Sequence, residues 1–168
     1  GIVITSTTAV PSPTAPLPGT PASPPGPGVA SSLNVITGNE IGSALVGVRI
    51  DSPLYNEVVN NTFVASGATG ILLPRGVTSL VTGNDVSGRE TGIYTDSKVA
   101  DLYGNLVHDN TVGMESRHGI IGPNNEPPYG TPGGKISDKV YGNATGILVP
   151  SDGAGVLVRF TDVYDNDV

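Results

Sequence analysis

A motif that recurs at intervals of 21 to 23 residues constrains this chain more than any other feature of its sequence. Each copy has an apolar residue, an Asn, a second apolar residue and then a Gly followed by an aliphatic side chain. The Asn residues that mark the copies are Asn39, Asn61, Asn84, Asn105, Asn143 and Asn166. Their separations are 22, 23, 21, 38 and 23 residues, so one interval contains an insertion. A period in the low twenties with strand-like units predicts a solenoid.

Three apolar columns follow from aligning the copies on the Asn. The first holds Ile36, Val58, Val81, Leu102, Val140 and Val163; the second holds Ile41, Phe63, Val86 and Val107; the third holds Val48, Ile71, Ile93, Met114 and Val156. Three short apolar segments per turn predict a triangular coil of parallel strands, with turns stacked about 4.8 Å apart. Such turns bury their inward side chains only against neighbouring turns. The Asn column is predicted to form one ladder of hydrogen-bonded amides where the coil bends.

The rest of the chain divides into three further parts. Residues 1–10 are β-branched and alternating, so they predict one strand, carried by Ile2, Val3 and Ile4. Residues 11–32 are rich in Pro, Ser, Thr and Gly and predict an extended linker that could hold this strand away from the coil. The coil itself is predicted over residues 33–168. Residues 122–134 contain the insertion and predict a loop, because Pro and Gly dominate them.

The repeat over residues 33–168 resembles the right-handed parallel β-helix family, which includes pectate-lyase-like proteins, alginate epimerases and surface proteins. The resemblance implies an all-β, right-handed, single-stranded parallel β-helix of about five turns. It also implies two kinds of function, because some members modify acidic polysaccharides and others are structural. The Asp-rich calcium cluster and the Asp-Pro-His signature of the enzymes are missing here. We therefore assign no catalytic residue, metal or cofactor.

Two groups of outward residues are candidates for a site. Asp96 and Arg117 fall in one column on consecutive turns, and His118 follows, so these three could line a polar groove. The plainer interpretation is a surface ion pair, worth at most about 1 kcal/mol. Tyr103, Tyr141 and Tyr164 fall in another column, where rings could stack on sugar faces. Aromatic residues also favour strands for structural reasons alone.

Composition limits the partners and the compartment. Fifteen acidic and eight basic residues give a net charge of −7, which disfavours nucleic-acid binding. There is no Cys, so disulfides and thiol chemistry are excluded. No apolar run approaches the roughly 20 residues that span a bilayer. The chain begins with Gly, as expected of a processed secreted protein or of a fragment. We expect a secreted, extracellular or cell-surface location.

Two functions stay open at the level of sequence. The first is an extracellular structural subunit that self-assembles end to end into a fibre or sheath. It rests on the first and last turns, which would expose strand edges and apolar interior, and on an N-terminal strand that could be donated to a neighbour. The alternative is a fragment of a polysaccharide-binding or polysaccharide-modifying protein, similar to lyases or epimerases. The expected partner is a second copy of the chain, with a polysaccharide as the alternative partner.

Overall fold

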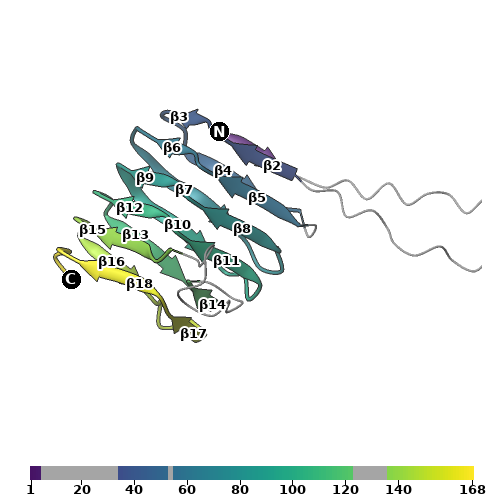
Figure 1. Ribbon diagram of the computed structural model, residues 1–168. Helices are drawn as coiled ribbons and strands as arrows, with labels where there is room; N and C mark the ends of the chain where they lie inside the picture. Colours follow the sequence, from purple (N-terminus) through teal and green to yellow (C-terminus); the bar gives the residue numbers. More distant parts are fainter. Residues whose placement is uncertain (5–33, 53–54, 123–135) are drawn as a thin grey trace, which may run out of the picture.

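The protein is a coil of parallel strands stacked along one axis, seen from the side in Figure 1. The computed structural model describes residues 1–4, 34–52, 55–122 and 136–168, and these contain strands and turns but no helix. The fold predicted from the sequence, an all-β parallel β-helix of about five turns, is confirmed. The predicted linker and nearly all of the predicted loop at residues 122–134 lie outside the described residues.

Three sheets form the sides of the coil, and every strand pair is parallel. Sheet A contains β1 (Ile2–Ile4), β4 (Val46–Ile50), β7 (Gly67–Leu73), β10 (Arg89–Thr95), β13 (Val112–Ser116) and β16 (Thr145–Leu148). Sheet B contains β2 (Asn34–Thr37), β5 (Asn56–Val59), β8 (Ser79–Thr82) and β11 (Ala100–Tyr103). Sheet C contains β3 (Glu40–Ile41), β6 (Thr62–Phe63), β9 (Asp85–Ser87), β12 (Leu106–His108), β15 (Asp138–Tyr141) and β18 (Thr161–Tyr164). A separate pair, β14 (His118–Ile121) and β17 (Ala154–Val158), follows on the side of sheet B.

Each sheet contributes an inward apolar column to the core, and sheet A also buries Ile50 and Leu73. The column of sheet B is Ile36, Val58, Val81 and Leu102; that of sheet C is Ile41, Phe63, Val86, Val107, Val140 and Val163; that of sheet A is Val48, Ile71, Ile93, Met114 and Ile147. Most of these side chains are fully buried. Three positions differ from the sequence alignment: Val140 and Val163 belong to sheet C, and Ile147, not Val156, continues sheet A.

The corner amides form two ladders, not the single ladder that the sequence alignment predicted. The first, between sheets B and C, runs through Asn39, Asn61, Asn84 and Asn105 and ends on Asp138. The second, between sheets C and A, runs through Asn110, Asn143 and Asn166. Both corners place an Asn three residues after a buried aliphatic side chain, so the local pattern of the two is the same. The insertion between β14 and β15 hid which corner each later Asn occupies.

Amide-to-amide bonds link the rungs of each ladder. The Asn84 side-chain nitrogen donates to Asn105 Oδ1 at 2.9 Å and to the Val58 carbonyl oxygen at 2.8 Å. In the second ladder, the Asn110 side-chain nitrogen donates to Asn143 Oδ1 at 3.1 Å. These side chains are buried, and each satisfies backbone groups that the bend leaves without a strand partner. The ladders therefore fix the positions of both corners.

The buried Arg89 side chain ties the third turn to the first. Its guanidinium donates to the carbonyl oxygens of Ala44 at 2.9 Å, Gly42 at 2.9 Å and Ile41 at 3.2 Å. A Cβ atom at Gly67 would lie 2.3 Å from the guanidinium, so the glycine leaves the space through which the side chain passes. Burial lowers the pKa of Arg89 from its ordinary value.

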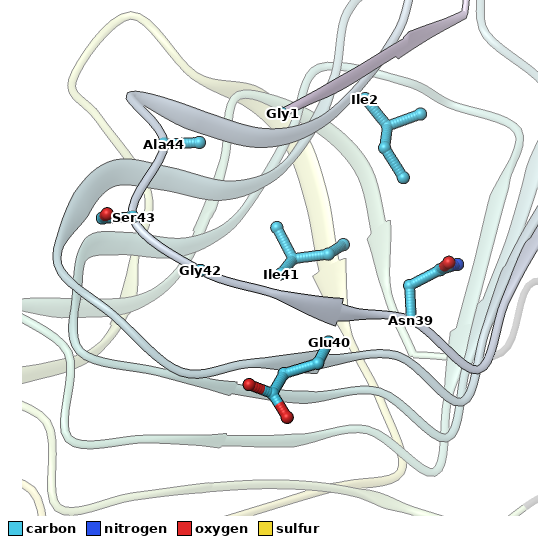
Figure 2. A pocket seen from close by; sticks show the side chains of 8 residues that line it. All are labelled: Gly1, Ile2, Asn39, Glu40, Ile41, Gly42, Ser43 and Ala44. Atoms are coloured by element: carbon cyan, nitrogen blue, oxygen red, sulfur yellow. The ribbon is translucent and has the colours of Figure 1, made fainter.

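The strand β1 covers the N-terminal end of the coil. It pairs with β4 of the same chain, and Ile2 and Ile4 pack against the core. Figure 2 shows Ile2 and Ile41 directed toward the interior from opposite sides, while Glu40 points away from it. Over residues 1–4 the predicted N-terminal strand thus lies on the coil and not apart from it. Residues 5–10 lie outside the described residues.

The C-terminal end of the coil exposes side chains that are buried elsewhere. Val140 on β15 is 0% exposed, but Val163, the next residue in the same column, is 48% exposed. Leu157 and Val158 on β17 are also about half exposed, at 48% and 43%. No described strand lies beyond β17 and β18 to cover them. The last turn therefore presents an apolar surface.

Candidate functional site

A polar cluster lies where the chain leaves sheet A. Asp96 directly follows β10, Arg75 follows β7 by two residues, and His118 is the first residue of β14. Because the strands stack in register, the residues that follow them are also brought together. His118 Nδ1 is hydrogen-bonded to Asp96 Oδ1, and Arg75 Nε lies 3.4 Å from Asp96 Oδ2. We call Arg75, Asp96 and His118 the Asp96 cluster.

A hollow of about 340 Å³ lies beside the Asp96 cluster. Its other lining residues are Gly76, Lys98 and Val99, so two cationic side chains face it together with one carboxylate. The Asp96 and His118 side chains are largely shielded, at 17% and 19% exposure, whereas that of Arg75 is 71% exposed. The hollow can therefore accept an anionic group at its rim, where Arg75 is accessible.

The surroundings keep the Asp96 carboxylate ionised. Burial acts to raise the pKa of Asp96, but the hydrogen bond from His118 and the charge of Arg75 outweigh it and lower the pKa below its ordinary value. A carboxylate of low pKa is a weak proton acceptor near neutral pH. Its role in this geometry is to hold the His118 ring and the Arg75 guanidinium in place.

The structure brings together two of the three polar residues predicted from the sequence. Asp96 and His118 are in contact, but the third, Arg117, pairs elsewhere: its Nη1 lies 2.8 Å from Asp152 Oδ2 and its Nε 3.7 Å from Glu115 Oε1. Arg75 takes the expected place of Arg117 beside Asp96. The alignment of the repeated copies could have identified Arg75 as a member of this cluster, because Arg75 falls in the same column as His118, two turns earlier.

The tyrosines predicted to form one column divide between two sheets. Tyr103 lies on β11 of sheet B, while Tyr141 and Tyr164 lie side by side on sheet C. His108 completes the sheet C stack, with ring centroids 5.1 Å from Tyr141, and Tyr141 lies 5.2 Å from Tyr164; both pairs are within 6° of parallel. These rings cover one another's faces. The Tyr141 ring is thus sandwiched between two others and has no open face to stack on a sugar.

Two carboxylates hold the His108 end of this stack. His108 Nε2 lies 2.9 Å from Asp85 Oδ1, and His108 Nδ1 lies 2.7 Å from Asp109 Oδ2. Burial acts to lower the pKa of His108, but the hydrogen bonds to Asp109 and Asp85 outweigh it and raise the pKa. Sequence reasoning did not identify this arrangement, which depends on neighbouring turns being in register.

Metal-binding and membrane-spanning features are not found in the part of the chain that the structure describes. No three His, Cys, Asp or Glu side chains of the described residues are grouped as a metal site. Within the same residues, no helix is long and apolar enough to cross a membrane.

Comparison with known proteins gives one match. A family model described as "Periplasmic copper-binding protein (NosD)" matches residues 28–145, which is more than two thirds of the 168 residues. No curated protein and no solved structure matches the chain. The matched segment includes four complete turns of the coil and the Asp96 cluster.

Proposed function

The chain belongs to the NosD family, and we propose that it is a structural β-helix subunit outside the cytoplasm that assembles end to end. The family's description as periplasmic agrees with a location outside the cytoplasm. The observation that carries the proposal is the apolar last turn, where Val163 is half exposed although its column is buried in every other turn. Exposed apolar interior and unpaired strand edges favour association with another chain. A contact between opposite ends of identical copies does not close and gives filaments.

A charge placed in the last turn tests this proposal. Val163→Asp is expected to abolish large assemblies in negative-stain microscopy and to lower the sedimentation coefficient of concentrated protein. Val163 is 48% exposed, so the substitution should leave the coil folded. Val64→Asp is the matched control, because Val64 is 49% exposed but follows β6, which lies in the second turn and is paired on both edges, by β3 and β9. Wild-type protein that stays monomeric at every concentration would refute end-to-end assembly.

The family's description names copper, but the described residues of this chain do not provide the ligand set of a copper site. Copper sites use imidazole, thiolate and thioether ligands. The chain has no Cys, and its single Met, Met114, is buried in the sheet A column. His108 and His118 lie on different strands, and each is hydrogen-bonded to Asp. We therefore propose no copper role for these residues.

Binding of an acidic polysaccharide is a second candidate function, favoured by the hollow beside the Asp96 cluster. Arg75 and Lys98 both line it, so a sugar carboxylate could pair with two cations. Arg75→Ala is expected to weaken binding of an oligouronide about tenfold, as the loss of one charge-assisted pair would. Arg49→Ala is the control, because Arg49 is an exposed arginine paired with Asp51 elsewhere. Equal affinity of both variants in calorimetry would exclude this site.

A further inference from the structure

The Asp96 cluster presents a third polar group to the hollow beside it, in addition to the two cations. His118 lines this hollow together with Arg75 and Lys98. Its Nδ1 is hydrogen-bonded to Asp96 Oδ1, whereas its Nε2 has no hydrogen-bond partner among the described residues. Nor is Nε2 one of the buried polar atoms that lack a partner there, so solvent reaches it. Nε2 is therefore the ring nitrogen that a ligand in the hollow can contact.

The Asp96 carboxylate decides where the proton of the His118 ring lies. Because the pKa of Asp96 is lowered, its carboxylate is ionised near neutral pH and can only accept hydrogen bonds. Nδ1 must therefore carry the proton that it donates to Asp96. Arg75 Nη2 also faces Nδ1, but at 3.4 Å it is the more distant neighbour. A neutral imidazole has one N–H and one lone pair, so the lone pair of His118 lies on Nε2, which accepts a hydrogen bond.

The hollow keeps one positive charge after its own groups are counted. Arg75 and Lys98 are cationic and Asp96 is anionic, so two positive charges and one negative charge leave +1 with a neutral His118. Both oxygens of Asp96 are engaged, Oδ1 by His118 and Oδ2 by Arg75. Lys98 has no hydrogen-bond or ionic partner within the described part of the chain. A single carboxylate on a ligand therefore balances the charge of the hollow.

The polar groups of the hollow come from three consecutive turns. Arg75 follows β7, Lys98 follows β10, and His118 begins β14 after β13. Neighbouring turns lie about 4.8 Å apart, a separation that one pyranose ring can bridge. Val99, which is 44% exposed, lines the same hollow and offers an apolar contact to the C–H groups of such a ring. The hollow thus has cations, one acceptor and an apolar side chain within the reach of one sugar unit.

We infer that His118 Nε2 accepts a hydrogen bond from a sugar hydroxyl while Arg75 and Lys98 bind the carboxylate of the same acidic sugar. The inference rests on the proposed binding of an acidic polysaccharide and identifies the residue that selects among such ligands. Asp96 is a positioning residue, because it acts on the ligand only through the His118 ring. A sugar whose hydroxyl is O-acetylated cannot donate this bond and leaves Nε2 unpaired in the filled hollow.

Calorimetric titration with two forms of one ligand tests this selection. The probes are a galacturonic acid trimer with free hydroxyls and the same trimer O-acetylated on its rings, both with free carboxylates. At pH 8, where imidazole is neutral in water, wild-type protein is expected to bind the acetylated form about tenfold more weakly. His118→Asn removes Nε2 but keeps an amide N–H near the position from which Nδ1 donates to Asp96. This variant is expected to bind both forms equally.

Two further variants separate the hydroxyl contact from the carboxylate contact. Lys98→Ala should weaken binding of both forms alike and keep the tenfold preference, because it removes a cation and leaves His118 in place. Arg49→Ala removes an exposed arginine that is paired with Asp51 and should change neither affinity. Thermal unfolding of each variant checks that the coil stays folded.

The outcomes distinguish this inference from the proposal on which it rests. A preference that survives in His118→Asn would come from the bulk of the acetyl groups and would overturn the role of His118. Equal binding of both forms by wild type, with a loss in Arg75→Ala, would also overturn that role and leave acidic-polysaccharide binding standing. No binding of either form to wild type would overturn both.

Discussion

At the scale of single residues, the corners of the coil depend on a carboxamide that both donates and accepts. Each Asn in the interior of a ladder accepts on Oδ1 from the previous rung and donates through its nitrogen to the next, so a chain of buried polar groups is satisfied. Asp138 ends the first ladder. Its Oδ1 accepts from Asn105 N at 2.9 Å and from the Asn105 side-chain nitrogen at 2.8 Å. Its Oδ2 is buried and has no hydrogen-bond partner among the described residues.

Asp138→Asn is expected to stabilise the protein at pH 7. Burial raises the pKa of Asp138 from its ordinary value of 3.8 to about 6. The folded state therefore keeps a proton that the unfolded chain releases, and the free energy of unfolding falls as the pH rises from about 4 to about 6. Asn carries no charge and restores the donor that the ladder lacks. The expected gain at pH 7 is roughly 1–3 kcal/mol.

Thermal unfolding between pH 4 and pH 8 measures this effect. The variant should be more stable than wild type above pH 6 and should lose the difference toward pH 4. Asp162→Asn removes the same charge from an exposed position on β18 and should leave the wild-type curve nearly unchanged. If wild type and Asp138→Asn depended on pH in the same way, the assignment of the effect to Asp138 would be wrong.

At the scale of elements, the glycine column of sheet A sets how closely the strands of successive turns approach. A Cβ at Gly92 would meet the Gly113 oxygen at 2.6 Å and Val107 Cγ1 at 2.7 Å, so it would press on the next strand and on the core together. Parallel strands about 4.8 Å apart leave no room for a Cβ atom at this position. The glycines of this column are therefore required by packing between turns and not by backbone angle.

Gly92→Ala is expected to lower the free energy of unfolding by roughly 1–3 kcal/mol, the usual cost of overpacking. Gly42→Ala is the matched control, because a Cβ there has nothing within 4 Å. Urea titration of both variants measures the difference. Equal midpoints would show that the strands can shift apart without cost, contrary to the packing argument.

At the scale of the whole molecule, charge and exposed apolar surface act in opposite directions on association. The net charge of −7 makes identical copies repel, whereas the apolar last turn attracts them. Raising the salt from about 10 mM to about 150 mM shortens the screening length from roughly 30 to roughly 8 Å. Sedimentation should therefore show more and larger assemblies at the higher salt. Dissociation by salt would indicate that opposite charges, and not apolar contacts, hold the ends together.

The sequence by itself determined the architecture of the coil. Repeated apolar positions, corner Asn residues and glycines recur at one period, and a period of about 22 residues admits few other folds. The inward columns through Val81, Val86 and Ile93 follow from the alignment of the repeated copies alone. Every turn repeats the same local sequence pattern, so that pattern alone predicts the fold.

Only the tertiary structure decided which copies of a repeated pattern are neighbours. An Asn after a buried aliphatic residue looks the same at either corner, so Asn143 could be placed in its ladder only through contact with Asn110. The same ambiguity separated Tyr103 from Tyr141. Asp96 and Arg117 follow register partners, as the alignment predicted, but Arg117 pairs with Asp152, and Asp96 pairs with Arg75 and His118. Side chains that meet across turns are set by register, and an insertion shifts register without changing the local sequence. The candidate site consists of contacts between turns, so the sequence predicted Asp96 and His118 but not their partner Arg75.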